Sequence, residues 1–379
     1  NLYYTKRTDL YAIVNYYWNG TGEKAAPSKE LHDRTLGEAW TEFPIEIQGY
    51  TIATTSSKTV TIQATSNVIN FYYYKNVELT ANSKTETYNG TLWTVEGYTG
   101  APADADFSAI TVSASGTDAG TYDAKFADNT VGKVDAAGKY IVTAATDGKL
   151  TINPAAVTVT ADNKSKVFGA AEPELTATVT GTLNGDEVAY TLSRDPGEDV
   201  GGYTITPTGE EIQGNYEVTY ETGTLTITPV TGKIVVTVTG HTGTAVYDGT
   251  AHTVTGYDVA ASNPLYTAAD FAFDGAASVT GTDAGGYPMG LAESQFRNVS
   301  ANFTEVSFVV NDGGLTVDKR PVTLTSVTDS KVYDRTPLTR PDVTVGGMGF
   351  VTGEVTGLHA TGSVLNVSQG AVRNDIEFT

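Results

Sequence analysis

The sequence predicts a mainly β protein, an elongated tandem array of small modules of the β-sandwich or β-grasp type. Three observations lead to this fold class. The 379 residues include 40 glycines and 22 tyrosines, which favour turns and strands respectively. Short motifs recur about every 80 residues, and apolar and polar side chains alternate with the period of a strand.

The composition excludes several classes of protein. The chain carries 44 acidic and 23 basic side chains, a formal charge of −21. Its surface therefore repels phosphate backbones and anionic headgroups, and we expect no nucleic-acid partner. No run approaches the roughly 18–20 apolar residues that span a bilayer, so we expect no membrane insertion. The absence of cysteine excludes disulfides, thiolate metal sites and a cysteine nucleophile.

Three signatures recur in the same order along the chain. The first is a turn built on an aromatic residue followed by Asp, Asn or Gly, and its aromatic residues are Tyr88, Phe168, Tyr247 and Tyr333. The second places an aspartate between glycines ahead of a tyrosine, at Asp118, Asp199 and Asp283. The third is a closing strand, Gly-x-Leu-x-Ile or a close variant, at residues 148–152, 223–227 and 313–317. Coincident periods of this kind indicate a repeat array.

Strands are predicted where apolar residues alternate with threonine. The inward-facing residues of three such strands are Val157 and Val159, Leu225 and Ile227, and Ile234, Val236 and Val238. Short strands joined by Gly and Asp turns are typical of sandwich-like modules. We expect each module to have its own core.

Residues 10–75 differ from the later repeats. The segment 11–18 reads as a tyrosine-rich strand, 36–42 as a short helix, and 68–75 as the last of the strands that follow Gly49. Strands around one short helix predict a small α+β module, of the β-grasp type.

The chain is therefore divided into six segments. They are 1–9, the final strand of a preceding module; 10–75, the first module; the repeats 76–153, 154–229 and 230–319; and 320–379, a truncated repeat. Residues 1–6 resemble residues 70–75, and the last segment has no closing strand. We expect a window from a longer array; the alternative is that a neighbouring copy of the chain supplies the missing strand.

The repeats resemble those of bacterial surface adhesins. Residues 16–20, 49–51 and 67–75 are similar to the mucin-binding-protein (MucBP-type) repeat. The later units are similar to the MBG and YDG modules that follow such repeats: Tyr247-Asp248-Gly249 matches the YDG tripeptide, whereas Phe168-Gly169 departs from it. The resemblance implies an extracellular, cell-wall-attached bacterial protein that is not an enzyme, with mucin or another host glycoprotein as its partner.

No constellation of residues predicts catalysis or a bound cofactor. The four histidines are His32, His241, His252 and His359. Only His241 and His252 share a module, and a metal or acid–base pair would require both rings to converge with a carboxylate such as Asp248. Asp104, Asp106 and the repeated aspartates could bind calcium, but an aspartate between glycines more often tightens a turn. We expect no metal site and no cofactor.

Aromatic side chains are the better candidates for recognition, because sugars stack on indole and phenol rings. Alternation along residues 71–74 places Phe71 and Tyr73 on one face and Tyr72 and Tyr74 on the other, so one pair should be core and the other exposed or covered. The candidate ligand contacts are Trp18, Tyr17, Tyr72, Tyr74 and Trp93.

Two functions remain from the sequence. The first is a non-enzymatic adhesin segment whose first module binds mucin-type glycoprotein and whose later modules form its stalk. The second is a purely structural spacer or a filament subunit that assembles by strand exchange between its end modules. Lysine–asparagine isopeptide cross-links are compatible with either, and the sequence assigns none.

Overall fold

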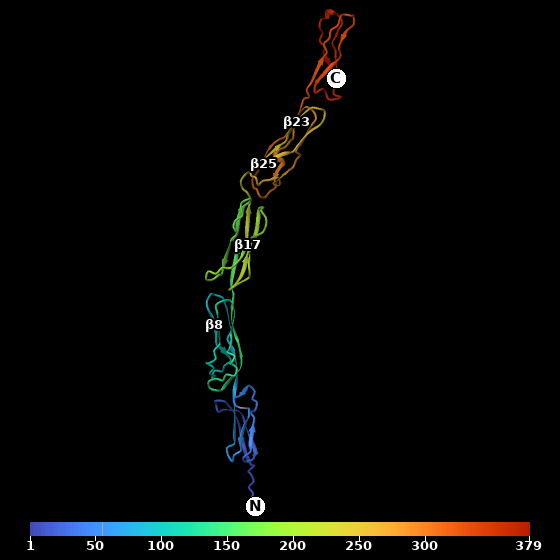
Figure 1. The fold of residues 1–379 in the computed structure, drawn as a ribbon. Helices are drawn as coiled ribbons and strands as arrows, with labels where there is room; N and C mark the ends of the chain where they lie inside the picture. The colour runs from blue at the N-terminus through green and yellow to red at the C-terminus, as the bar shows by residue number, and fades with distance from the viewer. Residues whose placement is uncertain (55) are drawn as a thin grey trace. The chain divides into compact units, whose positions relative to one another are not determined.

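Strands are the main regular element of the chain in the computed structural model, which describes residues 1–54 and 56–379 (Figure 1). The helical elements among these residues are three short 3-10 turns, η1 (Ala268–Asp270), η2 (Glu293–Gln295) and η3 (Val367–Gln369). Within the described chain, no helix has the length and apolar character needed to cross a membrane. The predicted fold class, mainly β with many small sheets in tandem, is confirmed.

The chain divides into two compact units. The first comprises Asn1–Asn163, Glu174–Asp195 and Thr204–Thr224, and the second comprises Lys164–Pro173, Pro196–Tyr203 and Leu225–Thr379. Strands β18 (Gly201–Thr208) and β21 (Gly223–Thr228) contribute residues to both.

The first module, residues 10–75, is built around a sheet with β6 at its centre. The strands of this module are β1 (Leu10–Trp18), β2 (Lys24–Arg34), β3 (Ala39–Glu42), β4 (Tyr50–Ile52), β5 (Lys58–Thr61) and β6 (Val68–Ala81). Of these, β3 and β5 form a separate two-stranded sheet. Strand β6 is parallel to β1 and antiparallel to β4, and β2 is antiparallel to β1. Phe71 and Tyr73 are buried with Tyr16 in the core, so the prediction that one aromatic pair of β6 is core is confirmed.

The short helix predicted over residues 36–42 is wrong. Residues 36–37 form a turn, with Gly37 at φ 78°, and Ala39–Glu42 form strand β3, which pairs with β5. The guanidinium of Arg34 lies 3.9 Å from the Trp40 ring centroid, and Glu42 is buried beside Lys29. Cross-strand pairing and burial therefore override the local helical propensity.

Strand β6 crosses the predicted boundary between residues 75 and 76 without a break. Its inward residues Ile69, Phe71 and Tyr73 belong to the core of the first module. Val77 and Leu79, on the same face further along, belong to the next core. Its second half is parallel to β12 (Tyr140–Thr146). One strand thus supplies side chains to two cores.

The later segments repeat a common strand pattern. The second contains β7 (Lys84–Thr87), β8 (Trp93–Glu96), β9 (Tyr98–Thr99), β10 (Ser113–Gly116), β11 (Gly120–Ala124), β12 and β13 (Gly148–Asn153). The third contains β14 (Ala155–Ala161), β15 (Lys164–Val167), β16 (Ala177–Thr180), β17 (Thr191–Arg194), β18, β19 (Ile212–Gln213), β20 (Tyr216–Glu221) and β21.

The remaining strands belong to residues 230–379. The fourth segment contains β22 (Ile234–Gly240), β23 (Thr242–Val246), β24 (His252–Thr255), β25 (Tyr257–Ala261), β26 (Phe271–Phe273), β27 (Ser278–Gly281), β28 (Gly285–Pro288), β29 (Phe296–Asn298), β30 (Val306–Asn311) and β31 (Gly314–Asp318). The last contains β32 (Val322–Ser326), β33 (Leu338–Thr339), β34 (Val343–Gly347), β35 (His359–Ala360), β36 (Ser363–Val364) and β37 (Ile376–Glu377).

Parallel pairs recur at fixed places in the repeats. The strand before the first-signature turn is parallel to the closing strand in three repeats, as β7 with β13, β15 with β21 and β23 with β31. The opening strand β14 is parallel to β20, and β22 is parallel to β30. The inward-facing residues predicted on β14, β21 and β22 are all buried.

The modules do not all have a separate hydrophobic core. One continuous hydrophobic cluster contains buried residues of both the second and the third segment, the first being Val77 and the last Val218. Tyr88 and Tyr216 meet edge to face across this junction, with ring centroids 5.5 Å apart. The expectation of one independent core per module is therefore wrong for these two segments. Residues 1–9 are exposed and form no strand.

Candidate functional site

Three of the five candidate aromatic residues lie on one face of the first module. Tyr17 of β1 pairs with Tyr72 of β6, and their rings stack with centroids 6.0 Å apart. Tyr74 lies on the same side of β6 beside Thr51 of β4. All three rings are half-buried. Because these residues alternate with the core residues Tyr16, Phe71 and Tyr73, the backbone holds them away from the core. We call Tyr17, Tyr72 and Tyr74 the tyrosine face.

A row of polar side chains continues the tyrosine face. The Asn15 side chain donates to Asn70 at 3.0 Å and accepts from the Ser28 hydroxyl at 2.6 Å. The Lys58 ammonium lies 5.6 Å from the Tyr72 ring centroid. Flat rings beside amides and hydroxyls are what a sugar or a polar peptide needs for stacking and hydrogen bonding.

The two candidate tryptophans lie elsewhere. Trp18 is on the core side of β1, where its ring is 4.1 Å from that of Tyr50 and the Lys75 ammonium lies 5.5 Å from it. Trp93 belongs to β8 in the second segment, 4.6 Å from the Lys84 ammonium. The structure therefore brings together Tyr17, Tyr72 and Tyr74 but neither tryptophan.

The histidines and carboxylates do not converge. His252 Nε2 lies 3.0 Å from Asp248, whereas His241 lies 3.5 Å from Asp258. Thr255 O and Asp258 raise the pKa of His241. Within residues 1–54 and 56–379, no group of three His, Cys, Asp or Glu side chains is placed to hold a metal ion.

The first signature forms a turn closed by a side chain. Asp248 Oδ1 accepts hydrogen bonds from the backbone and the hydroxyl of Thr250, which lower the pKa of the carboxyl to about 2. Asn89 accepts from Thr91 in the same way, and Asp334 from Thr336. These are Asx turns. The residue after each of these side chains has a positive φ, which Gly90 and Gly249 adopt without strain and which Arg335 also adopts, at φ 70°.

In the second signature, a tyrosine ring packs directly against a glycine. A Cβ atom on Gly116 would lie 2.2 Å from the Tyr122 ring, and one on Gly281 2.4 Å from the Tyr287 ring. Each tyrosine hydroxyl donates to the backbone carbonyl of the signature aspartate, at Asp118, Asp199 and Asp283. The repeated aspartate thus has its carbonyl committed to the turn, while its carboxylate is left available.

That carboxylate is used at two junctions between segments. At the first, Asn215 donates to the Asp118 carboxylate at 3.0 Å and accepts from the Ala119 amide at 2.7 Å. At the second, Asn302 donates to the Asp199 carboxylate at 2.9 Å and accepts from the Val200 amide at 2.9 Å. We call these paired bonds the Asn–Asp clamps.

An aromatic contact accompanies each clamp. Tyr216, next to Asn215, packs on the first-signature residue Tyr88. Phe303, next to Asn302, packs on Phe168 with ring centroids 5.5 Å apart. Sequence analysis missed Asn215 and Asn302. The available signal was the recurrence of an asparagine followed by an aromatic residue just before a strand.

A lysine lies at the centre of an ion cluster in the second unit. The Lys166 ammonium lies 2.8 Å from Glu172 and 2.6 Å from Glu198, and its side chain is only 5% exposed. The hydrogen bonds that the ammonium donates to these two carboxylates raise the pKa of Lys166. Because the partners are carboxylates and not an asparagine, these contacts point to an ion pair and not to an isopeptide bond.

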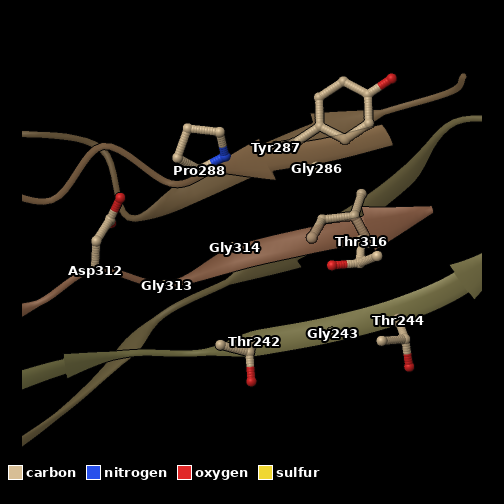
Figure 2. A pocket seen from close by; sticks show the side chains of 11 residues that line it. Thr242, Gly243, Thr244, Gly286, Tyr287, Pro288, Asp312, Gly313, Gly314 and Thr316 are labelled. Carbon is tan, nitrogen blue, oxygen red and sulfur yellow. The ribbon is translucent and has the colours of Figure 1, made fainter. Parts of the chain in front are cut away.

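The hollow shown in Figure 2 is a shallow feature of a sheet face. It has a volume of about 550 Å³ and lies over β23, β28 and β31. Small residues such as Gly243, Gly286 and Gly314 leave the space, beside the hydroxyls of Thr244 and Thr316. The Asp312 carboxylate at its edge already accepts from the amides of Gly290 and Leu291. The residues that line the hollow therefore offer no unpaired charge to a ligand, and we propose no binding site there.

Comparison with known protein families matches two of the repeats. Residues 157–226 match the MBG domain of the YGX type, and residues 234–319 match the MBG domain. No curated protein matches the chain. The matched residues contain both partners of the second clamp, Asp199 and Asn302. Two successive repeats in the middle of the chain are therefore similar to MBG-type domains, which supports a repeat region like that of surface adhesins.

Proposed function

We propose that this chain is a non-enzymatic segment of a bacterial cell-surface adhesin, located outside the cell and attached to the wall. The first module, of MucBP type, binds mucin or another host glycoprotein, and the repeats after it act as a stalk. The observation that carries the binding role is the tyrosine face. Tyr17 and Tyr72 stack beside the hydrogen-bonded amides of Asn15 and Asn70, on the side of the sheet away from the core.

The stalk role is supported by the junctions. Two clamps and two aromatic contacts fix successive repeats by the same chemistry. A stalk module holds a binding module in place. This task requires stable junctions between neighbouring repeats and requires no ligand-binding cavity. The MBG-type matches cover the repeats that carry the second clamp.

Mucin binding by the full chain tests the proposal. We expect the double substitution Tyr17→Ala/Tyr72→Ala to weaken binding to immobilised mucin at least tenfold, about 1.4 kcal/mol, because it removes the stacked pair. The matched control is Tyr3→Ala/Tyr4→Ala, which removes two highly exposed tyrosines from the N-terminal tail. Equal losses in both variants, or no binding by the unmodified chain, would contradict the binding role.

The alternative function is a structural spacer or a filament subunit that assembles by strand exchange. It is favoured by residues 1–9, which are exposed and carry Leu2, Tyr3 and Tyr4 without a strand partner in the described structure. Sedimentation velocity of the full chain and of a chain lacking residues 1–9 separates the two functions. Concentration-dependent assembly that is lost on deletion supports the filament, and a monomer at all concentrations opposes it.

A further inference from the structure

The chain contains three asparagines that are followed by glycine, and two of them lie in the same tripeptide. Asn19 and Asn89 each begin the sequence Asn-Gly-Thr, and Asn184 precedes Gly185. Glycine has no Cβ, so its backbone nitrogen can approach the side-chain amide carbon of the asparagine before it. Asparagine is for this reason a thermolabile residue. Because the tripeptide is identical at both places, a difference in reactivity between Asn19 and Asn89 should come from the fold.

Two donors hold the side-chain oxygen of Asn89. Its Oδ1 accepts from the backbone amide of Thr91 at 2.9 Å and from the Thr91 hydroxyl at 2.7 Å. Negative charge develops on this oxygen when a nucleophile adds to the amide carbon. Donors that are already in place stabilise such a charge, as in the oxyanion hole of an enzyme. The Asx turn therefore activates the Asn89 side chain for attack.

The attacking and leaving groups of this site are both free. Within residues 1–54 and 56–379, neither the backbone amide of Gly90 nor the Nδ2 of Asn89 has a hydrogen-bond partner. The Asn89 side chain is also exposed, so water reaches it. The Gly90 nitrogen can lose its proton, and the Asn89 amino group can leave, without breaking a contact.

The other two asparagines lack this arrangement. Asn19 is half-buried, and its Nδ2 donates to the Gly138 carbonyl at 2.7 Å. The Thr21 hydroxyl donates to the Trp18 carbonyl at 3.2 Å, and no donor in the described part of the chain reaches Asn19 Oδ1. The leaving group of Asn19 is thus held, and its oxygen is unsupported. Asn184 is exposed but likewise has no donor to its Oδ1 among the described residues.

We propose that the first-signature turn of the second segment is a modification site, at which Asn89 deamidates spontaneously with water as the co-reactant. The Gly90 nitrogen gives its proton to solvent and bonds to Asn89 Cγ. The bond from Cγ to Nδ2 breaks, and the amino group takes up a proton and leaves as ammonia. Water then opens the resulting succinimide ring at either carbonyl, which gives aspartate or isoaspartate.

Both products change the first junction. Aspartate makes the tripeptide Tyr-Asp-Gly, and Thr91 would donate to its carboxylate as in the turn at residues 247–250. Isoaspartate adds a main-chain carbon one residue after Tyr88, whose amide donates to the Asn153 carbonyl and whose ring contacts Tyr216. The proposal goes beyond the stalk role, because it makes a contact between two repeats subject to a slow covalent change.

Incubation of the folded full chain at mildly alkaline pH, followed by peptide mapping with mass spectrometry, tests the proposal. The replacement of NH₂ by OH gives a mass gain that locates each modified asparagine. We expect Asn89 to deamidate at least about fivefold faster than Asn19, and faster than Asn184, because of its two donors. Synthetic peptides with the sequences of residues 15–24 and 85–94 should react at similar rates, because neither holds the donors in place.

A substitution at Thr91 tests the role of the donors. Thr91→Val removes the hydroxyl, keeps the size of the side chain and keeps the backbone donor, and should slow deamidation of Asn89 at least about threefold. The matched control is Thr21→Val, at the same position of the other tripeptide, which should leave the rate at Asn19 unchanged. Four results would each overturn the proposal: no mass gain at Asn89, a rate at Asn19 as high as that at Asn89, the same rate ratio in the peptides, or no effect of Thr91→Val.

Discussion

The second and third junctions use the same signature in two different states. At the second, Asp199 is bound by Asn302 and Phe168 packs on Phe303. At the third, between the fourth segment and the last, the Asp283 carboxylate has no hydrogen-bond partner within the described residues, and the Tyr247 hydroxyl donates to Glu354. The tyrosine-on-glycine turn is nevertheless present in both, at Tyr203 and Tyr287. The turn therefore forms without the clamp. The backbone carbonyl of the aspartate accepts a hydrogen bond within the turn, and its carboxylate accepts one in the clamp.

The largest expected difference concerns the aromatic contact. Tyr216→Ala removes a 4% exposed ring from the shared cluster and should destabilise β14 and β20 by about 3–5 kcal/mol. Tyr247→Ala, at a half-buried ring outside any of the three core clusters, should cost less than about 1 kcal/mol. Hydrogen exchange of the amides in β14 and β20, compared with β23 and β31, measures both effects. Similar losses at the two positions would show that burial of the Tyr216 ring in the shared cluster is not the source of the difference.

The clamp itself should have the next largest effect. Asn215→Ala removes a hydrogen bond to a carboxylate and one to an amide, and should cost about 1.5–3 kcal/mol. The double-mutant cycle with Asp118→Ala should show strong coupling, because either change alone breaks the same contact. Hydrogen exchange at Ala119 and at Ala155, whose amide donates to the Asn215 carbonyl, reports the loss.

The control for the clamp is Asp283→Ala, which should leave hydrogen exchange in the fourth segment unchanged. A loss there as large as that caused by Asp118→Ala would mean that the aspartate stabilises its own turn. The distinction between turn and junction would then fail.

A glycine substitution isolates the turn from the junction. Gly116→Ala and Gly281→Ala place a methyl group within 2.4 Å of a tyrosine ring, and each should cost about 1–2 kcal/mol by forcing the ring to move. The two effects should be equal, since both turns have the same contact. Gly286→Ala has no atom within 4 Å of its new methyl group and serves as the control. Circular dichroism during thermal unfolding measures the three variants.

The smallest expected effect is a pH dependence in the first-signature turns. The pKa of Asp248 is about 2, below its usual value, because Thr250 donates to the carboxylate. The contribution of this turn to stability is present above about pH 4 and is lost as the pH falls through 2. The Thr250 amide resonance should titrate with this pKa, whereas Thr91, held by the uncharged Asn89, should not. Titration of both resonances alike would rule out Asp248 as the cause.

The sequence predicted the features that depend on local patterns. Alternation identified the buried Leu225 and Ile227, and separated Phe71 and Tyr73 from Tyr72 and Tyr74. The helix over residues 36–42 failed because the pairing of β3 with β5 is a long-range contact. For the candidate site, alternation along one strand could place Tyr72 and Tyr74 together. The stacking of Tyr17 on Tyr72 follows from the register of β1 against β6, which no local pattern specifies.

The clamps were missed for a similar reason. Asn215 and Asn302 lie ahead of a strand, where asparagine is common for turn formation alone. Asn215 also bonds Asp118, which lies 97 residues earlier in the chain. Only the structure shows this role in joining two segments. A repeated residue can thus carry a contact to the next repeat that its own repeat does not explain.

The passage of β6 through two cores has a consequence for engineering. Ile69, Phe71, Tyr73, Val77 and Leu79 all face inward, so inserting a single amino acid near Lys75 would turn one half of the strand inside out. Excising the glycan-binding candidate at residue 75 would likewise sever this strand and strip Lys75 from β12. A transplantable version should extend at least to Ala81 and carry the pairing strand with it.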